Sequence, residues 1–490
     1  MSRRDKRNIP MWAKLGHGKP VTRRDFLSTG IIPFAAWAVA PSLATILNPL
    51  KAYGADQCAA AGAGSFIPFI TLNLSGGAGL AGQVVVKNLQ GDNIKSYTKL
   101  GQGNGPGLSY NISKEFGKVD FAGTAIGGNT QGNVSKFLTG VRDPRNQNLR
   151  IAALDKSAFV WQAVASNDDT SNNPVDVTGL VLKMGLQGSK LPNLGRTDTS
   201  TGINQKPAVL PPPAPFVVGN VNDLANALGY SAALNNLSMK QKGALARVIA
   251  SLSGSQVRRI GETDNATVIT NLVDCAGIKN VDLIATGGGD VNPFAVGGTV
   301  TSELARIWGV NANDRTSQNA TFAAMVYNGI SGNASTINLN MGGYDYHDNT
   351  RTTGDTRDLE AGRVVGKILE TAEMLKKPVF LFVCSDGATT SMESGTADSV
   401  WVSDRGIAGI QYMISYDPIK RPETSSTQVG GFNEGQAADG KFATANNPEL
   451  AAQAVFANYA ALNGKMDFLE QNRILGDAAL RAQAIKFEKG

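Results

Sequence analysis

The sequence predicts an α/β protein with a doubly wound, mostly parallel central sheet and helices on both faces. Residues 66–74 and 378–384 are short apolar runs, too short for buried helices, and both read as central strands. Residues 336–341 and 410–415 predict two more strands. Strand and helix patterns alternate between 336 and 415, as they do where helices connect the parallel strands of a sheet covered on both faces.

The remaining elements are predicted mainly from apolar periodicity and from end signals. Residues 158–165 predict a short helix that ends in the polar stretch 166–173. Ser238 is a suitable N-cap for a helix that runs to about Ser251. Further helices are expected at 256–274, 298–308, 317–330, 359–375, 448–463 and 476–487. A proline-rich passage, 210–215, precedes the helical part, so we predict a helical insertion around 219–330 within a single domain over 56–490.

The N-terminal 55 residues have the pattern of an export signal. Residues 1–20 hold six Lys or Arg and one acid, and a mostly apolar run follows at 31–50. A basic N-terminal region, an apolar middle region and small residues at the cleavage site are typical of secretion signals. Between them, Arg23-Arg24 followed by Asp25-Phe26-Leu27 resembles the twin-arginine signal. We therefore predict export in folded form by the twin-arginine translocase, to the periplasm or outside the cell.

The apolar run is a poor permanent membrane span. It is rich in Ala and interrupted by Pro33, Pro41 and Pro49, whereas a spanning helix needs about 20 strongly apolar residues. Cleavage is expected after Gly54 or Ala55, which leaves no stable membrane span. An uncleaved anchor is the alternative, and lipid attachment is disfavoured because Gln57 precedes Cys58.

Charge and cysteine content limit the class of partner. The net charge is +6, but residues 1–54 carry nine basic and two acidic residues, and the rest carries 37 and 38. Because the remainder has no basic stripe, we expect no nucleic-acid partner. Three cysteines do not make a disulfide framework. Either Cys58 pairs with Cys275, or these two and Cys384 are unpaired thiols.

Residues suited to a binding or catalytic site directly follow the predicted strands. Gly76-Gly77 follows the first strand, Asp345 and His347 follow the strand at 336–341, and Asp386 follows the strand at 378–384. Sites in open parallel sheets form at these carboxyl ends. Paired glycines let the backbone approach a ligand closely, and a carboxylate after a buried strand is costly without a partner. An Asp after a strand is, on its own, more often a helix cap or a turn former than a ligand, but together these residues predict a site.

The motif Gly342-Gly343-Tyr344-Asp345-x-His347, with Ser385-Asp386-Gly387 after the next strand, resembles the family called domain of unknown function 1501. That family is related to the alkaline phosphatase and sulfatase superfamily. The resemblance implies an alkaline-phosphatase-like fold with a metal site at the carboxyl edge of the sheet. The ligands that it implies are Asp345, His347, Asp386 and Asp404.

The sequence departs from this family at two points. Arg405 stands where the family's Thr-Asp-His-Gly motif has a His, and Ala78-Gly79 replaces an Asp in the first turn. A two-zinc site needs several histidines. The chain has two, and His17 lies in the signal, so only His347 remains and a two-zinc site is not expected.

Two interpretations follow. In the first, the scaffold has lost catalysis, and Arg405 is a fixed cation that pairs with Asp386 or Asp345 or holds an anionic ligand. The protein is then a pseudoenzyme with a binding or structural role. In the second, Asp345, Asp386 and Asp404 hold one Ca²⁺ or Mg²⁺, and the protein hydrolyses a phosphate or sulfate ester, with Arg405 stabilising the charge of the ester.

The second interpretation requires a nucleophile. The candidates are Ser166, Thr170 and Ser171 in the polar stretch 166–173, which is otherwise a solvated turn. Cys384 is a poor candidate because it lacks the Cys-x-Pro-x-Arg context of sulfatases and has no adjacent His to activate it.

Overall fold

The structure, a computed structural model, divides the chain into two compact units. One comprises Met1–Pro49 and Gly229–Ala285, and the other comprises Leu50–Leu228 and Thr286–Gly490. The residues that the structure describes are 66–94, 111–165, 174–195, 204–207, 215–224, 291–345, 351–388, 390–391, 401–402 and 408–488, with short gaps in some ranges, and five single positions between 238 and 251. The export signal, Cys58 and Cys275 lie outside these residues, and the predictions made for them stay predictions.

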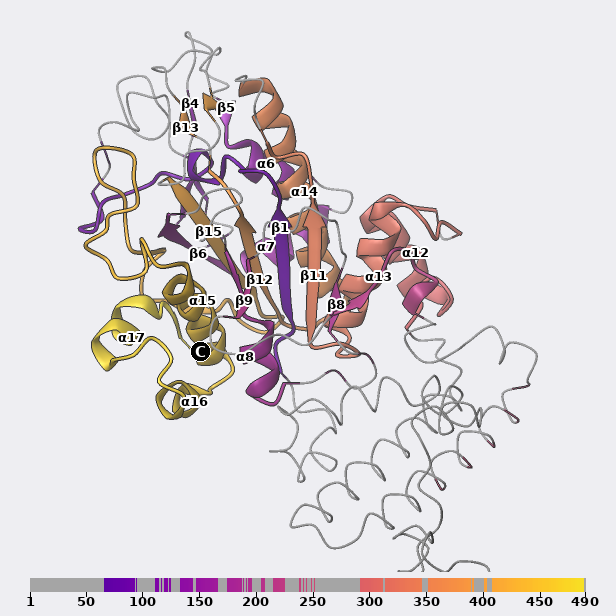
Figure 1. Cartoon of the computed structure of the whole chain (residues 1–490). Coiled ribbons are helices and arrows are strands. Elements are labelled where there is room, and N and C mark those ends of the chain that lie inside the picture. The colour runs from indigo at the N-terminus through magenta and orange to yellow at the C-terminus, as the bar shows by residue number, and fades with distance from the viewer. Residues whose placement is uncertain are drawn as a thin grey trace, which may run out of the picture. The chain divides into compact units, whose positions relative to one another are not determined.

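The second unit contains an eight-stranded sheet, which confirms the predicted doubly wound α/β class (Figure 1). Seven strands run in the same direction, and β15 alone runs antiparallel to its two neighbours. In spatial order the strands are β10 (Phe216–Val217), β8 (Leu194–Gly195), β11 (Thr336–Met341), β1 (Phe69–Leu74), β12 (Val379–Ser385), β15 (Gly409–Tyr416), β6 (Ser157–Val164) and β17 (Gln428–Val429). Both edge strands are only two residues long, which limits pairing with other chains.

Helices and short strand pairs surround this sheet. The helices are α6 (Lys136–Arg142), α7 (Gln147–Asp155), α8 (Thr178–Lys183), α12 (Gly298–Trp308), α13 (Gln318–Ile330), α14 (Arg351–Leu375), α15 (Pro448–Leu462), α16 (Met466–Gln471), α17 (Ala478–Ala484) and the short 3₁₀ helix η3 (Leu80–Gly82). The strand pairs are β2 (Asn111–Ser113) with β3 (Val119–Phe121), β4 (Gly123–Thr124) with β5 (Asn133–Val134), β7 (Val175–Asp176) with β9 (Asn204–Pro207), β13 (Thr390–Ser391) with β14 (Trp401–Val402), and β16 (Glu423–Thr424) with β18 (Phe487–Glu488). Among the described residues, no helix combines the length and apolar content needed to cross a membrane.

Each face of the sheet is covered by its own set of helices. On one face, α8 and α15 pack against a core in which the Tyr459 ring lies 5.0 Å from Phe69 and 5.4 Å from Phe380. On the other face, Phe137 of α6 lies 5.2 Å from Tyr412 of β15, and α14 packs on α6 and α7. Figure 1 shows α8 and α15 on one side of the strands and α6, α7 and α14 on the other. Burial of apolar side chains on both faces is the main source of stability in such a sheet.

The packing of α6 on α14 depends on glycine. A Cβ at Gly140 of α6 would lie 2.1 Å from the carbonyl oxygen of Leu359, and a Cβ at Gly362 of α14 would lie 2.0 Å from that of Phe137. The two helix backbones therefore approach more closely than any side chain would allow.

The prediction of a helix at 158–165 was wrong, because these residues form β6. All eight residues of β6 are buried, and a strand buried on both faces shows no alternation that would distinguish it from a buried helix segment. The strand is rich in residues that favour β structure, including Phe159, Val160 and Trp161. Its place beside β15 gives it eight paired residues.

Most other predicted elements are confirmed with small changes. β11 has the predicted limits, 336–341, and α12, α13 and α15 begin and end within a residue of prediction. The C-terminal helix predicted at 476–487 is shorter (α17) and is preceded by α16, which was not predicted. The helix predicted from 359 begins at Arg351 instead.

The capping prediction for Ser238 is also confirmed. The Ser238 hydroxyl accepts from the Gln241 amide at 3.4 Å, and the Gln241 side chain accepts from the Ser238 amide at 2.8 Å. This reciprocal pair is a capping box. The helix predicted at 256–274 lies outside the described residues.

One buried acid gives the fold a defined pH dependence. Burial raises the pKa of Glu373 in α14, but hydrogen bonds from Lys376, Tyr416 and Lys156 outweigh it, and the net pKa is lowered. Lys156 Nζ lies 3.2 Å from the carboxylate. A lowered folded-state pKa means that the group stabilises the fold above its unfolded pKa, about 4.3, and that this contribution disappears as the pH falls through the folded-state pKa.

We therefore expect the free energy of unfolding of the wild type to decrease between about pH 5 and pH 3, and part of this decrease to be absent in Glu373→Gln. Urea unfolding at a series of pH values measures this. The exposed Glu470 of α16 provides a control, Glu470→Gln, which should keep the wild-type pH dependence. The same pH dependence in Glu373→Gln and wild type would contradict the prediction.

Candidate functional site

Three strand ends meet at the carboxyl edge of the sheet. β1 lies between β11 and β12, and Leu74 pairs with Met341 on one side and with Ser385 on the other, so all three strands end at the same level. Beyond them, the amide of Tyr344 donates to the carbonyl of Ser75 at 3.1 Å. The amide of Gly76 donates to Asp386 Oδ1 at 2.6 Å. The turn after β1 is thus bonded to the loops that follow both neighbouring strands.

Gly76 separates the two described acids of the predicted site. Its φ is +116°, and a Cβ there would lie 2.6 Å from the amide nitrogen of Asp345 and 2.8 Å from the Asp345 Cβ. Asp345 therefore contacts one side of this residue, while Asp386 accepts from its amide. Asp386 is buried, with 5% of its surface exposed, and Asp345 is exposed. The structure brings together these two of the four predicted metal ligands.

Ser385 holds the same turn, a role that the sequence analysis did not assign. Its hydroxyl donates to the Leu74 carbonyl at 2.6 Å and accepts from the amides of Gly77 at 3.2 Å and Ala78 at 2.8 Å. Together with Asp386 it binds three successive amides of the turn. The sequence signal was the pair of polar residues directly after a buried strand, where each needs a hydrogen-bonding partner.

A second polar cluster lies just inside the sheet edge. Asn73 Nδ2 donates to Ser75 Oγ at 3.0 Å and to Asn340 Oδ1 at 2.8 Å, and Ser75 Oγ donates to the same Asn340 oxygen at 2.7 Å. Cys384 Sγ lies 3.9 Å from Asn73 Oδ1. The cluster links β1 to both of its neighbours.

Cys384 is a buried, unpaired thiol. Burial raises its pKa well above the ordinary value, and the negative charges of Asp386 and Asp176 add to the effect. The reactive form of cysteine is the thiolate, which burial and these two charges disfavour. This agrees with its rejection as a nucleophile from the sequence.

Six of the predicted site residues lie outside the described part of the chain: His347, Asp404, Arg405, Ser166, Thr170 and Ser171. Two strands that flank some of these residues in the sequence, β6 and β15, are described, and their ends can be located in the sheet. β6 ends at Val164, which pairs with Gly409 at the start of β15. Because β6 runs in the direction of β1 and β15 runs opposite, both of these strand ends lie at the carboxyl edge, three and two strands from β1.

One cation near this edge was missed by the sequence analysis. The guanidinium of Arg357 lies against Gly343, where a Cβ would be 3.1 Å from Nη2. The Tyr344 hydroxyl donates to the Arg357 carbonyl at 3.1 Å. Arg357 was missed because α14 was predicted to start at 359. The helix starts at Arg351, and its second turn therefore lies beside the loop after β11.

The donor set decides which metal would fit. Zinc is bound by nitrogen and sulfur as well as by oxygen, whereas Asp345 and Asp386 offer oxygen only and the thiol of Cys384 is buried inside the sheet. These residues do not fit a zinc pair. They fit part of a Ca²⁺ or Mg²⁺ site, because those ions take carboxylate and carbonyl oxygens. Within the described residues, no group of three or more His, Cys, Asp or Glu side chains lies together.

Comparisons of the chain with family models, with curated proteins and with solved structures gave no match. The sheet topology by itself defines the class of this protein: a doubly wound α/β protein with a mostly parallel eight-stranded sheet. The resemblance to the domain of unknown function 1501 rests on the motifs at 342–347 and 385–387.

Proposed function

We propose that this chain is an exported, non-hydrolytic binding protein on a phosphatase- and sulfatase-like scaffold, and that it binds an anionic ligand at the carboxyl edge of its sheet. The observation that supports this most is the 2.6 Å hydrogen bond from the Gly76 amide to Asp386 Oδ1. A hydrolase of this superfamily would direct that acid at a metal. Here one oxygen of the buried Asp386 carboxylate holds the turn after β1.

The other groups at this edge support a binding role. Ser385 is hydrogen-bonded to three backbone groups of the same turn, so its hydroxyl is a poor nucleophile. The side chains of Asp345 and Arg357 are exposed. Charges of opposite sign, one in the loop after β11 and one on α14 beside that loop, are suited to orienting a charged ligand. Export by the twin-arginine translocase is part of the same proposal and rests on the N-terminal motif.

A second candidate is the hydrolysis of phosphate or sulfate esters with one bound cation. It is favoured by the position of Asp345 and Asp386 on two sides of Gly76. Asp345, Asp386 and Asp404 would then hold Ca²⁺ or Mg²⁺. The bound cation would neutralise charge on the ester and lower the pKa of the attacking group. In that function Arg405 would contact the ester and a Ser or Thr of 166–173 would act as nucleophile.

The test compares wild type with Asp345→Ala. Protein purified after export is analysed for bound metal and assayed with p-nitrophenyl phosphate and p-nitrophenyl sulfate, with and without added Ca²⁺ or Mg²⁺. We expect no turnover above the background of buffer and no stoichiometric metal. Asp467→Ala, a change of an exposed acid in α16, is the matched control. Cation-dependent turnover in wild type and Asp467→Ala that is lost in Asp345→Ala would replace our proposal with the second candidate.

A further inference from the structure

We propose that Arg357 is the residue that binds an oxyanion at this site, through its guanidinium and a phosphate, sulfate or carboxylate group of the ligand. This inference rests on the proposed function, since it names the chemical class of the ligand.

The position of the guanidinium depends on a glycine in the candidate site. An ideal Cβ at Gly343 would lie 3.1 Å from Arg357 Nη2, 3.2 Å from Cζ and 3.5 Å from Nε. The φ of Gly343 is +87°, which favours glycine on its own account. The guanidinium therefore lies directly against the backbone of the loop that carries Asp345 two residues later. The hydrogen bond from Tyr344 Oη to the Arg357 carbonyl, at 3.1 Å, fixes α14 to the same loop.

The guanidinium retains donors for a ligand. Within the described part of the chain, the Arg357 side chain makes one hydrogen bond, in which Nη1 donates to Glu360 Oε2 at 3.0 Å. A guanidinium has five N–H donors in a planar fork, so Nε and Nη2 remain for a bidentate contact with an oxyanion. Both Arg357 and Glu360 are 41% exposed. An exposed pair of this kind contributes about 1 kcal/mol or less, so a ligand can compete with Glu360 at little cost.

Three other arginines of this helical layer, all with described side chains, are occupied by structural partners. Arg150 is buried against Glu370, and Arg306 bridges Glu303 and Glu370. Arg363, on the same helix as Arg357 and 47% exposed, donates through Nε to Asp143 at 2.5 Å. Arg363 links α14 to the end of α6, whereas Arg357 lies beside the strand-end loop. Arg363 is therefore a matched control, with the same charge, on the same helix and of similar exposure.

The experiment measures binding of inorganic phosphate and inorganic sulfate to the full-length exported protein by isothermal titration calorimetry. Arg357→Gln should weaken binding about tenfold or more, because charge-assisted hydrogen bonds are lost. Arg363→Gln should leave the Kd unchanged. Glu360→Gln should tighten binding, because it removes the competing carboxylate. Gly343→Ala should weaken binding, because its Cβ displaces the guanidinium. Thermal melts of each variant identify any loss of folding.

Three results would overturn the inference: equal Kd for wild type and folded Arg357→Gln, equal weakening in Arg363→Gln, or no binding of either anion by wild type at millimolar concentration. Failure of the proposed function looks different. Wild type that hydrolyses the esters, with Arg357→Gln raising only KM, would reject the non-hydrolytic proposal and keep the role of Arg357. If wild type does not hydrolyse the esters but binds anions independently of Arg357, the non-hydrolytic proposal is kept and the role of Arg357 is rejected.

Discussion

Glu370→Gln is expected to destabilise the protein by about 3–5 kcal/mol, because it leaves the buried Arg150 guanidinium without its counter-charge. Arg150 of α7 is 2% exposed and Glu370 of α14 is fully buried. Burial lowers the pKa of Arg150, and the attraction of Glu370 opposes that effect. Glu370 is therefore the main carboxylate that keeps the buried arginine charged, and Asp143 adds a smaller attraction.

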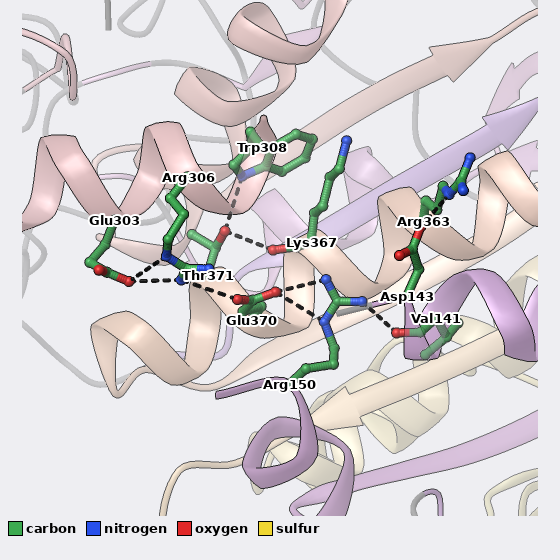
Figure 2. Close-up of polar contacts among 10 residues, drawn as sticks. All are labelled: Val141, Asp143, Arg150, Glu303, Arg306, Trp308, Arg363, Lys367, Glu370 and Thr371. Carbon is green, nitrogen blue, oxygen red and sulfur yellow. Dashed lines mark hydrogen bonds and ion pairs between the residues drawn. The ribbon is translucent and has the colours of Figure 1, made fainter. Parts of the chain in front are cut away.

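Figure 2 shows the geometry that makes the pair so sensitive. Arg150 donates to Glu370 Oε2 through Nε at 3.1 Å and Nη2 at 2.7 Å, and through Nη1 to the carbonyl of Val141 at 2.5 Å. The second carboxylate oxygen of Glu370 accepts from Arg306 of α12 at 3.3 Å. Glu370 of α14 thus joins α7 and α12, and Arg150 extends the network to α6 through the Val141 carbonyl.

Chemical denaturation of wild type and variant measures the effect. Glu303→Gln is the control, since Glu303 also pairs with Arg306 but is 32% exposed, and its loss should cost about 1 kcal/mol or less. The double variant Arg150→Met with Glu370→Met should recover much of the loss, because apolar side chains of similar length need no partner. Equal destabilisation by Glu370→Gln and Glu303→Gln would show that the burial of the pair is not what matters.

Gly76→Ala is expected to destabilise the protein by about 3 kcal/mol, and to disturb the candidate site directly. Two effects add. The added Cβ would lie 2.6 Å from the backbone nitrogen of Asp345, which cannot rotate away, and overpacking of this kind costs about 1–3 kcal/mol. The φ of +116° is also unfavourable for any residue with a Cβ, at about 1–3 kcal/mol.

Gly77→Ala separates the two effects. Gly77 has a similar φ, +107°, but its Cβ would meet only ordinary contacts at 3.5 Å from Gly387 and Ala388. It should therefore show the backbone cost alone, about 1–2 kcal/mol. Urea unfolding gives both values, and hydrogen exchange at the Tyr344 amide reports the loop after β11. Equal free energies of unfolding for the two variants would contradict the steric argument.

The strands nearest the site were predictable because local signals and tertiary environment agree there. β1 and β12 come from short apolar runs, β11 alternates polar and apolar residues, and each strand is found where it was expected. β6 was not predictable for the opposite reason. Complete burial removes the alternation on which strand prediction depends, and only pairing with β15 distinguishes Ser157–Val164 from a buried helix.

The candidate site was predictable as a location and less so as a set of contacts. A parallel sheet brings its strand ends to one edge, so the sequence alone indicated that Asp345 and Asp386 would lie close together. It did not indicate that Asp386 would accept from the amide of Gly76, 310 residues away. Arg357 was missed because the start of α14 carries no apolar periodicity.

From its residues alone, this chain could be recognised as a doubly wound α/β protein whose polar groups gather at one sheet edge. The direction of β15, the order of the strands and the partners of Ser385, Asp386 and Arg357 depend on contacts between distant segments. No local pattern records such contacts, because strand direction and hydrogen-bond partners are selected by the packing of the whole domain.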